Sequence, residues 1–190
     1  MSGLTSIITP VSILVGGAFL LYLISRLLHL SNRVMSILTV LILLGTLIPL
    51  ISFYQQIPDL LRDSNALFGD PEPGGIIYKH SAVGIFILII GSFIAILISL
   101  YSGEYLSRDS RFLVYYPLVL LTLAGLMGMF ISNNLFNLFL LTELTTITAS
   151  ALVAFRFHQV IAIKAGFKYL IMSSWGPMTM LLGLDFVYRS

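Results

Sequence analysis

Charged residues are scarce in this chain of 190 residues: only 9% are Asp, Glu, Lys or Arg, whereas 58% are hydrophobic. Soluble domains carry about 25% charged residues on average. A soluble globule needs a charged, hydrated surface, and this composition does not supply one. The composition therefore excludes an ordinary soluble domain and indicates a protein embedded in lipid.

Cysteine is absent, which excludes disulfides, thiolate metal sites and cysteine nucleophiles. The net charge is only +2, and Lys and Arg occur singly along the sequence, so the clustered basic patch of a nucleic-acid-binding protein is missing. The sequence also has no glycine-rich phosphate loop, nucleophile triad or Cys/His cluster. We expect no cofactor, no metal and no nucleic-acid partner for this chain.

The sequence is rich in long apolar stretches. A helix that spans a bilayer needs roughly 20 mostly apolar residues. Six segments meet this requirement, at about residues 8–28, 34–53, 83–101, 113–131, 135–155 and 161–187. We predict an all-α fold, a polytopic bundle of about six transmembrane helices in a single transmembrane domain over residues 1–190. The first stretch lacks a basic leader and a small-residue cleavage site, so we expect a retained helix and not a cleaved signal peptide.

One connection is long, and we expect an outer loop over residues 55–80. Its second half contains GDPEPGG, a turn-forming sequence that does not form a helix. Its first half, IPDLLRDSNALF, is compatible with a short helix at the membrane interface.

Basic residues are distributed unequally between the two sides of the predicted bundle. One side holds Arg26, Arg33, Arg108, Arg111, Arg156 and Lys164. The other side holds Arg62, Lys79 and Arg189. Because loops rich in Lys and Arg stay in the cytoplasm, we predict a multi-pass protein of a prokaryotic cell (inner) membrane with its amino terminus outside.

Helix 135–155 contains Glu143, the residue of this sequence that costs the most free energy to place in a membrane. At 1.5 Å per residue Glu143 lies ~13 Å from the start of this helix, close to the middle of a ~30 Å hydrocarbon core. An ionisable side chain there costs at least ~2.5–3.5 kcal/mol and indicates a functional site. Thr146 and Ser150 follow on the same helical face, and Asn137 lies near the outer entrance. We predict a proton or ion path along this stripe; alternatively, the hydroxyls join helices and Glu143 is neutral and hydrogen-bonded.

Helix 161–187 carries Lys168 two turns from its start and Lys164 one turn earlier on the same face. Because the two helices run antiparallel, we expect Glu143 and Lys168 at similar depth, from which they can pair across the hairpin. Alternatively Lys168 extends to the interface as we expect for Lys164. Pro177 removes one backbone donor and frees the carbonyl four residues earlier, which predicts a helix kink that water can enter, although prolines also occur in membrane helices without such a role.

Four sequence pieces occur in the order and spacing of a known family. They are GGIIYKHSAVGIF, YSGEYLSRD, NNLFNLFLLTEL and KAGFKYLIMSSWGPMTMLLG. The last three pieces lie in residues 101–183, which resemble the amino-terminal half of the antiporter-like subunits of complex I, multisubunit Na+/H+ antiporters and energy-converting membrane hydrogenases. The first piece precedes this range and resembles the family's entry into helix three. The family often has Asp where this chain has His80.

The resemblance implies roles for two residues. Glu143 matches the proton-path carboxylate that modulates a lysine, and Lys168 matches a supporting residue. The main proton-carrying lysines of the family lie on helices seven and eight, so the resemblance implies a shortened or split member with part of the first five-helix inverted repeat.

The implied function is that of an antiporter-like membrane subunit in a redox-driven, proton- or sodium-translocating complex, complex I-like or hydrogenase-like. We expect no redox site in this chain; its partners would be other membrane subunits, the lipid bilayer, and H+ or Na+. The alternatives are a non-pumping structural or bridging subunit of such a complex and an independent six-helix carrier.

Overall fold

The computed structural model describes residues 2–28, 30–62, 67–69, 77–79, 82–106, 112–132 and 134–189. The helices in these ranges are α1 (Ser2–Leu28), α2 (Asn32–Arg62), α3 (Ala82–Tyr105), α4 (Phe112–Ile131), α5 (Leu135–Val153) and α6 (Val160–Arg189). Two short strands, β1 (Leu67–Gly69) and β2 (Ile77–Lys79), pair antiparallel with Phe68 opposite Tyr78. The predicted all-α fold of six helices is confirmed, with this small strand pair as an addition.

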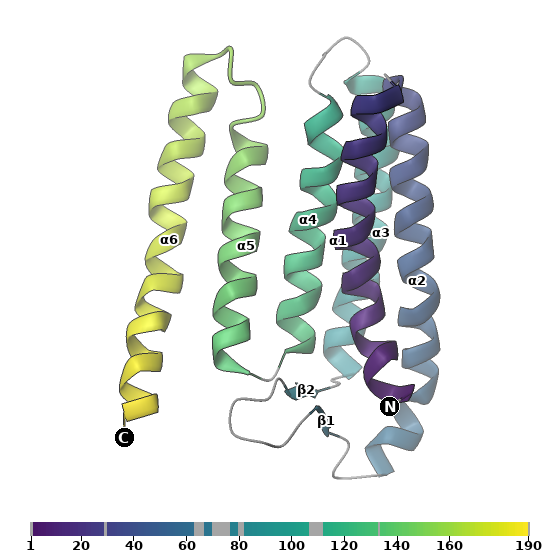
Figure 1. The fold of residues 1–190 in the computed structure, drawn as a ribbon, viewed down its shortest axis with the longest axis vertical. Coiled ribbons are helices and arrows are strands. Elements are labelled where there is room, and N and C mark those ends of the chain that lie inside the picture. Colours follow the sequence, from purple (N-terminus) through teal and green to yellow (C-terminus); the bar gives the residue numbers. More distant parts are fainter. Residues whose placement is uncertain are drawn as a thin grey trace.

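The helices form a four-helix bundle with two further helices added along one side. Helices α1 to α4 pack on one another, α5 packs on α4, and α6 packs on α5 at the outer edge (Figure 1). The buried side chains of the hydrophobic core all come from α1 to α4, and include Leu14, Leu43, Leu88, Tyr116 and Met127. Residues of α5 and α6 therefore lie outside the main core.

The surface of the bundle is strongly apolar. Phe19, Ile48 and Phe93 are each more than half exposed, with 67%, 70% and 57% of their surface accessible. Apolar surface of this extent marks contact with membrane or protein. The chain is a multi-pass membrane protein.

Five helices in the described part of the chain are long and apolar enough to cross a membrane. They cover Thr9–Leu28, Asn32–Ser52, Gly84–Tyr105, Phe112–Ile131 and Leu135–Val153. Helix α6 has 30 residues, which is ample length for a span. Its lysines, serines and Pro177 lower its hydropathy, so composition alone does not identify α6 as a spanning helix.

The segment 55–80, predicted as an outer loop whose first half is compatible with a short helix, begins with helix in the structure. Helix α2 continues through Gln55 and Pro58 to Arg62, because this stretch still contains residues that favour helix, such as Gln and Leu. The structure then adds β1 and β2, and the GDPEPGG sequence lies largely outside the described residues.

Candidate functional site

Helix α5 begins with a capped turn. Asn134 has an extended backbone (φ −100°, ψ 125°), and its side-chain oxygen accepts hydrogen bonds from the backbone N–H groups of Phe136 at 2.9 Å and Asn137 at 3.3 Å. The Asn137 amide donates to the Ser132 hydroxyl at 3.0 Å. Asn137, predicted to lie at the entrance of an ion path, thus also takes part in the turn that starts α5.

The buried side chains of α5 all carry hydroxyls: they are Thr146, Thr148 and Ser150. Thr148 lies against α4, where its hydroxyl is 3.0 Å from that of Thr122. Thr146 and Ser150 are each 8% exposed, and the Ser150 hydroxyl donates to the carbonyl of Ile147 at 2.8 Å. Two members of the predicted polar stripe, Thr146 and Ser150, are therefore buried.

Glu143 lies on the border of this buried surface. Its neighbour at i+3, Thr146, is buried, whereas Leu140 at i−3 and Ile147 at i+4 are 48% and 50% exposed. The side chain of Glu143 is accordingly half-buried, which corrects the expectation of a fully buried carboxylate. The physical reason is that α5 packs mainly between α4 and α6, leaving one side of the helix uncovered.

The register of α5 against α6 follows from one close contact. A Cβ added to Gly166 would lie 2.5 Å from the Cβ of Ala154, so these residues meet where the hairpin begins. Because the helices run antiparallel, equal steps of eleven residues from this contact reach Glu143 on α5 and Pro177 on α6. Lys168 lies ~13 Å from the level of Glu143 at 1.5 Å per residue, so the expected Glu143–Lys168 pair at similar depth is wrong.

The two lysines of α6 point away from α5. Lys164 and Lys168 are exposed, and they lie on the helical face opposite the buried residues Gly166, Pro177 and Leu184. Both side chains are therefore available to lipid headgroups or to a neighbouring protein.

Pro177 is buried and lies near the level of Glu143. It has no N–H for the carbonyl of Ser173, and the Ser173 hydroxyl donates to the carbonyl of Tyr169 at 2.6 Å. Glu143 therefore lies at the level of a stretch of α6 with an interrupted hydrogen-bond ladder.

The ligands available at this site are oxygen atoms. Carboxylate, hydroxyl and carbonyl oxygens suit protons and hard cations and do not suit soft metals. Within the described ranges, no group of three or more His, Asp or Glu side chains is close enough to hold a metal ion.

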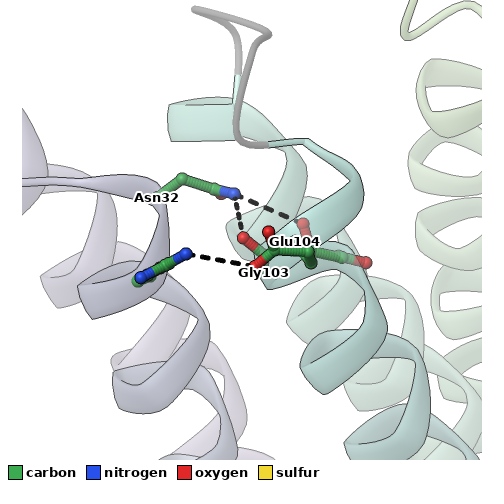
Figure 2. A network of polar contacts seen from close by, with 5 residues as sticks. Asn32, Gly103 and Glu104 are labelled. Atoms are coloured by element: carbon green, nitrogen blue, oxygen red, sulfur yellow. Dashed lines mark hydrogen bonds and ion pairs between the residues drawn. The ribbon is translucent and has the colours of Figure 1, made fainter.

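A second polar cluster, which the sequence analysis missed, joins α2, α3 and α4 at the upper end of the bundle in Figure 1. The buried amide of Asn32 donates to the carbonyls of Gly103 at 2.7 Å and Ser102 at 3.3 Å (Figure 2). Its oxygen accepts from the Tyr116 hydroxyl at 2.9 Å. The last carbonyls of a helix lack partners within it. Asn32 provides one for Gly103 and adds a second donor to Ser102, whose carbonyl also accepts from the N–H of Leu106 at 2.9 Å.

The sequence YSGEY, which carries part of the family resemblance, supplies the contacts around this cluster. Gly103 allows α2 to approach, since an added Cβ would lie 2.8 Å from the Ser36 hydroxyl. Glu104 pairs with Arg33 at 3.4 Å, on the exposed side of the cluster (Figure 2). Tyr105 accepts a hydrogen bond of 2.7 Å from Arg156, which follows the end of α5 in the sequence. The motif itself was visible in the sequence, but the residues that it contacts are far away in sequence.

Comparisons with known proteins agree with this architecture. The family model for the transmembrane region of NADH:quinone oxidoreductase and Mrp antiporter subunits matches residues 132–190, which include α5 and α6. NADH-quinone oxidoreductase subunit N of Desulforudis audaxviator is 35% identical over 126 residues, covering 63% of this chain and 24% of that protein. A Na(+)/H(+) antiporter subunit of Alkalihalophilus pseudofirmus is 31% identical over 103 residues, covering 54% of this chain and 12% of that protein.

A solved structure shares the fold. A chain of the membrane-bound sulfane sulfur reductase, an archaeal respiratory membrane complex, superposes with a TM-score of 0.76 at 22% identity, over 95% of this chain and 36% of that one. The fold is that of a multi-pass membrane protein. Residues 132–190 thus match the antiporter-like family of transmembrane subunits, and the chain is similar to complex I subunit N and to Mrp antiporter subunits. It spans about a quarter of the length of the first of these relatives.

Proposed function

We propose that this chain is an antiporter-like subunit of a redox-driven membrane complex that translocates H+ or Na+, and that Glu143 contributes to its ion path. The observation that carries the proposal is the stripe of Glu143, Thr146 and Ser150, which lies within the segment that matches the family model. A carboxylate and hydroxyls on one helical face provide hydrogen-bonding partners for a proton or for a file of waters.

The geometry supports a particular arrangement of charges. Lys168 lies on the outer face of α6 and ~13 Å from the level of Glu143. A cation that modulates Glu143 therefore has to come from a helix other than α6. We place it on a neighbouring membrane segment or subunit, next to the uncovered side of α5. The redox chemistry would belong to other subunits of the complex.

Replacing Glu143 by Gln in the assembled complex tests the proposal. The variant keeps the size and hydrogen-bonding capacity of the side chain but cannot release a proton, so ion translocation per electron transferred should fall about tenfold or more. Translocation is measured in sealed vesicles with a pH-sensitive dye and with radioactive sodium, which also distinguishes H+ from Na+. Redox turnover is measured in the same vesicles.

Glu104→Gln provides a matched control, because Glu104 is an exposed carboxylate paired with Arg33 at the helix end. It should leave coupling unchanged. Full coupling in a normally assembled Glu143→Gln complex would rule out the proposed role of Glu143.

The second candidate function is a structural or bridging subunit without ion transport. Two observations favour it: Glu143 is only half-buried, and α6 exposes large apolar side chains such as Trp175 and Phe186, at 68% and 75%. An outer helix of this kind suits a contact with a neighbouring subunit. This candidate predicts that Glu143→Gln has no effect on coupling, whereas loss of the chain prevents assembly.

A further inference from the structure

A long groove runs along α4 between α3 and α5. Its upper part, a cavity of about 560 Å³, is lined by Tyr101, Tyr105, Arg156 and Gln159. Its lower part, a cavity of about 440 Å³, is lined by apolar residues of α3 and α4 such as Gly91 and Leu126. Ile98, Tyr115 and Leu152 line both parts, so the two cavities adjoin at these residues.

The two ends of the groove differ in chemistry. Its upper end holds a guanidinium, two phenols and an amide, whereas Thr122 and Tyr115 contribute the polar side chains of the lower part. The Thr122 hydroxyl is already satisfied, since it lies 2.8 Å from the carbonyl of Leu118. An occupant of the groove thus needs one polar end and one apolar end.

Arg156 makes the upper end suitable for an anion. Its guanidinium donates to the Tyr105 hydroxyl at 2.7 Å and lies 5.3 Å from the centre of the same ring. The ring of Tyr105 in turn stacks on Tyr101 at 5.6 Å, which fixes the position of the charge. Across the described part of the chain no carboxylate pairs with Arg156, and a guanidinium has five N–H donors, so donors remain for a phosphate.

The length of the groove matches one membrane leaflet. From Gly91 to Tyr105 helix α3 rises ~21 Å at 1.5 Å per residue, and half of a bilayer with its headgroups is ~20–22 Å thick. Tyrosines and arginines also occur where a membrane meets water. The polar end of the groove therefore lies at headgroup level and its apolar end near the membrane centre.

We propose that this groove binds one anionic phospholipid, with its phosphate at Arg156 and Tyr105 and an acyl chain along Ile98 and Leu123. An apolar helix would leave the Arg156 charge without a partner, whereas a phosphate supplies one. The lipid would connect α3 to α5, two helices that flank α4, and would stabilise the attachment of the α5–α6 hairpin to the bundle.

Lipid retention by the detergent-purified complex tests the proposal. The complex is first reconstituted in vesicles of phosphatidylcholine with phosphatidylglycerol, extracted again, and its bound lipids are quantified by mass spectrometry. The wild type should retain one phosphatidylglycerol at this site, and Arg156→Gln should weaken its retention about tenfold. Arg156→Lys should keep most of the preference for anionic lipid, because it keeps the charge.

Two further variants separate the groove from the surrounding surface. Ile98→Trp fills the place where both cavities meet and should abolish retention without removing a charge. Ile87→Trp, on an exposed part of α3 outside the groove lining, should not affect it. Arg33→Gln controls for loss of a basic residue at the same end of the bundle.

Three results would overturn the proposal. One is equal retention of phosphatidylcholine and phosphatidylglycerol, and another is unchanged retention in both Arg156→Gln and Ile98→Trp. The third comes from a photoreactive amino acid at position 98 in native membranes: crosslinks to polypeptide instead of lipid would identify a protein helix as the occupant.

Discussion

At the scale of single residues, two neighbouring polar side chains at the start of α2 differ greatly in their contribution to stability. Asn32 is 6% exposed and bonds to two carbonyls and one hydroxyl. Arg33 pairs with Glu104, but the two side chains are 74% and 78% exposed. Exposed ion pairs contribute about 0–1 kcal/mol, whereas a buried group left without its partner costs about 1–3 kcal/mol.

We therefore predict that Asn32→Leu lowers the free energy of unfolding by about 2–4 kcal/mol, since the Gly103 carbonyl and the Tyr116 hydroxyl each lose a buried hydrogen bond. Arg33→Gln should change it by less than about 1 kcal/mol. Thermal unfolding of the purified protein in detergent measures both. Equal melting temperatures for the two variants would show that water replaces the amide of Asn32, contrary to the buried cluster described above.

At the scale of helices, the sequence allowed much of the fold to be predicted. The predicted helix 113–131 corresponds to α4, Phe112–Ile131, because a bilayer-spanning helix is identified by hydropathy alone. The polar stripe of α5 was also predictable, since Glu143, Thr146 and Ser150 share a face through helical periodicity. Whether Glu143 is buried was not predictable, because that depends on how far α6 covers α5.

The register between α5 and α6 could not be predicted from the sequence either. Equal depth was expected for Glu143 and Lys168 on the assumption that both helices start at the membrane surface. The contact of Gly166 with Ala154 instead sets the pairing. The partners of YSGEY could not be found either, since Asn32 and Arg156 are distant in sequence and meet only through packing.

Substitutions of two glycines of α6 test this register. Gly166→Ala should destabilise the hairpin by about 1–3 kcal/mol through overpacking against Ala154. Gly183→Ala should stabilise the protein by up to about 1 kcal/mol, since an added Cβ there meets nothing within 4 Å and Ala favours helix. Melting temperatures should thus shift in opposite directions.

A compensating change completes this test. Ala154→Gly removes the methyl group that Gly166→Ala would meet, so the double variant should recover most of the lost stability. A melting temperature of the double variant no higher than that of Gly166→Ala would contradict the close contact of α5 with α6.

At the scale of the whole molecule, the distribution of charge bears on orientation. The helix directions bring the ends of α1 and α3, the starts of α2 and α4 and the α5–α6 connection to one end of the bundle, and the strand pair to the other (Figure 1). Among the described residues, the first end carries Arg26, Arg33, Arg156 and Lys164, and the second carries Arg62, Lys79 and Arg189. Basic residues near an anionic leaflet gain ~1 kcal/mol each, so we propose that the first end faces the cytoplasm.

Introduced cysteines can determine this orientation directly, because the chain has none of its own. His158 in the α5–α6 connection and Asp185 near the end of α6 are both exposed, and they lie at opposite ends of α6. A membrane-impermeant maleimide should label His158→Cys in inverted vesicles but not in intact cells, and should label Asp185→Cys with the opposite preference. The reverse pattern would place the amino terminus in the cytoplasm. It would also place Arg156 and the proposed lipid in the outer leaflet, so this measurement decides which leaflet should supply the anionic headgroup.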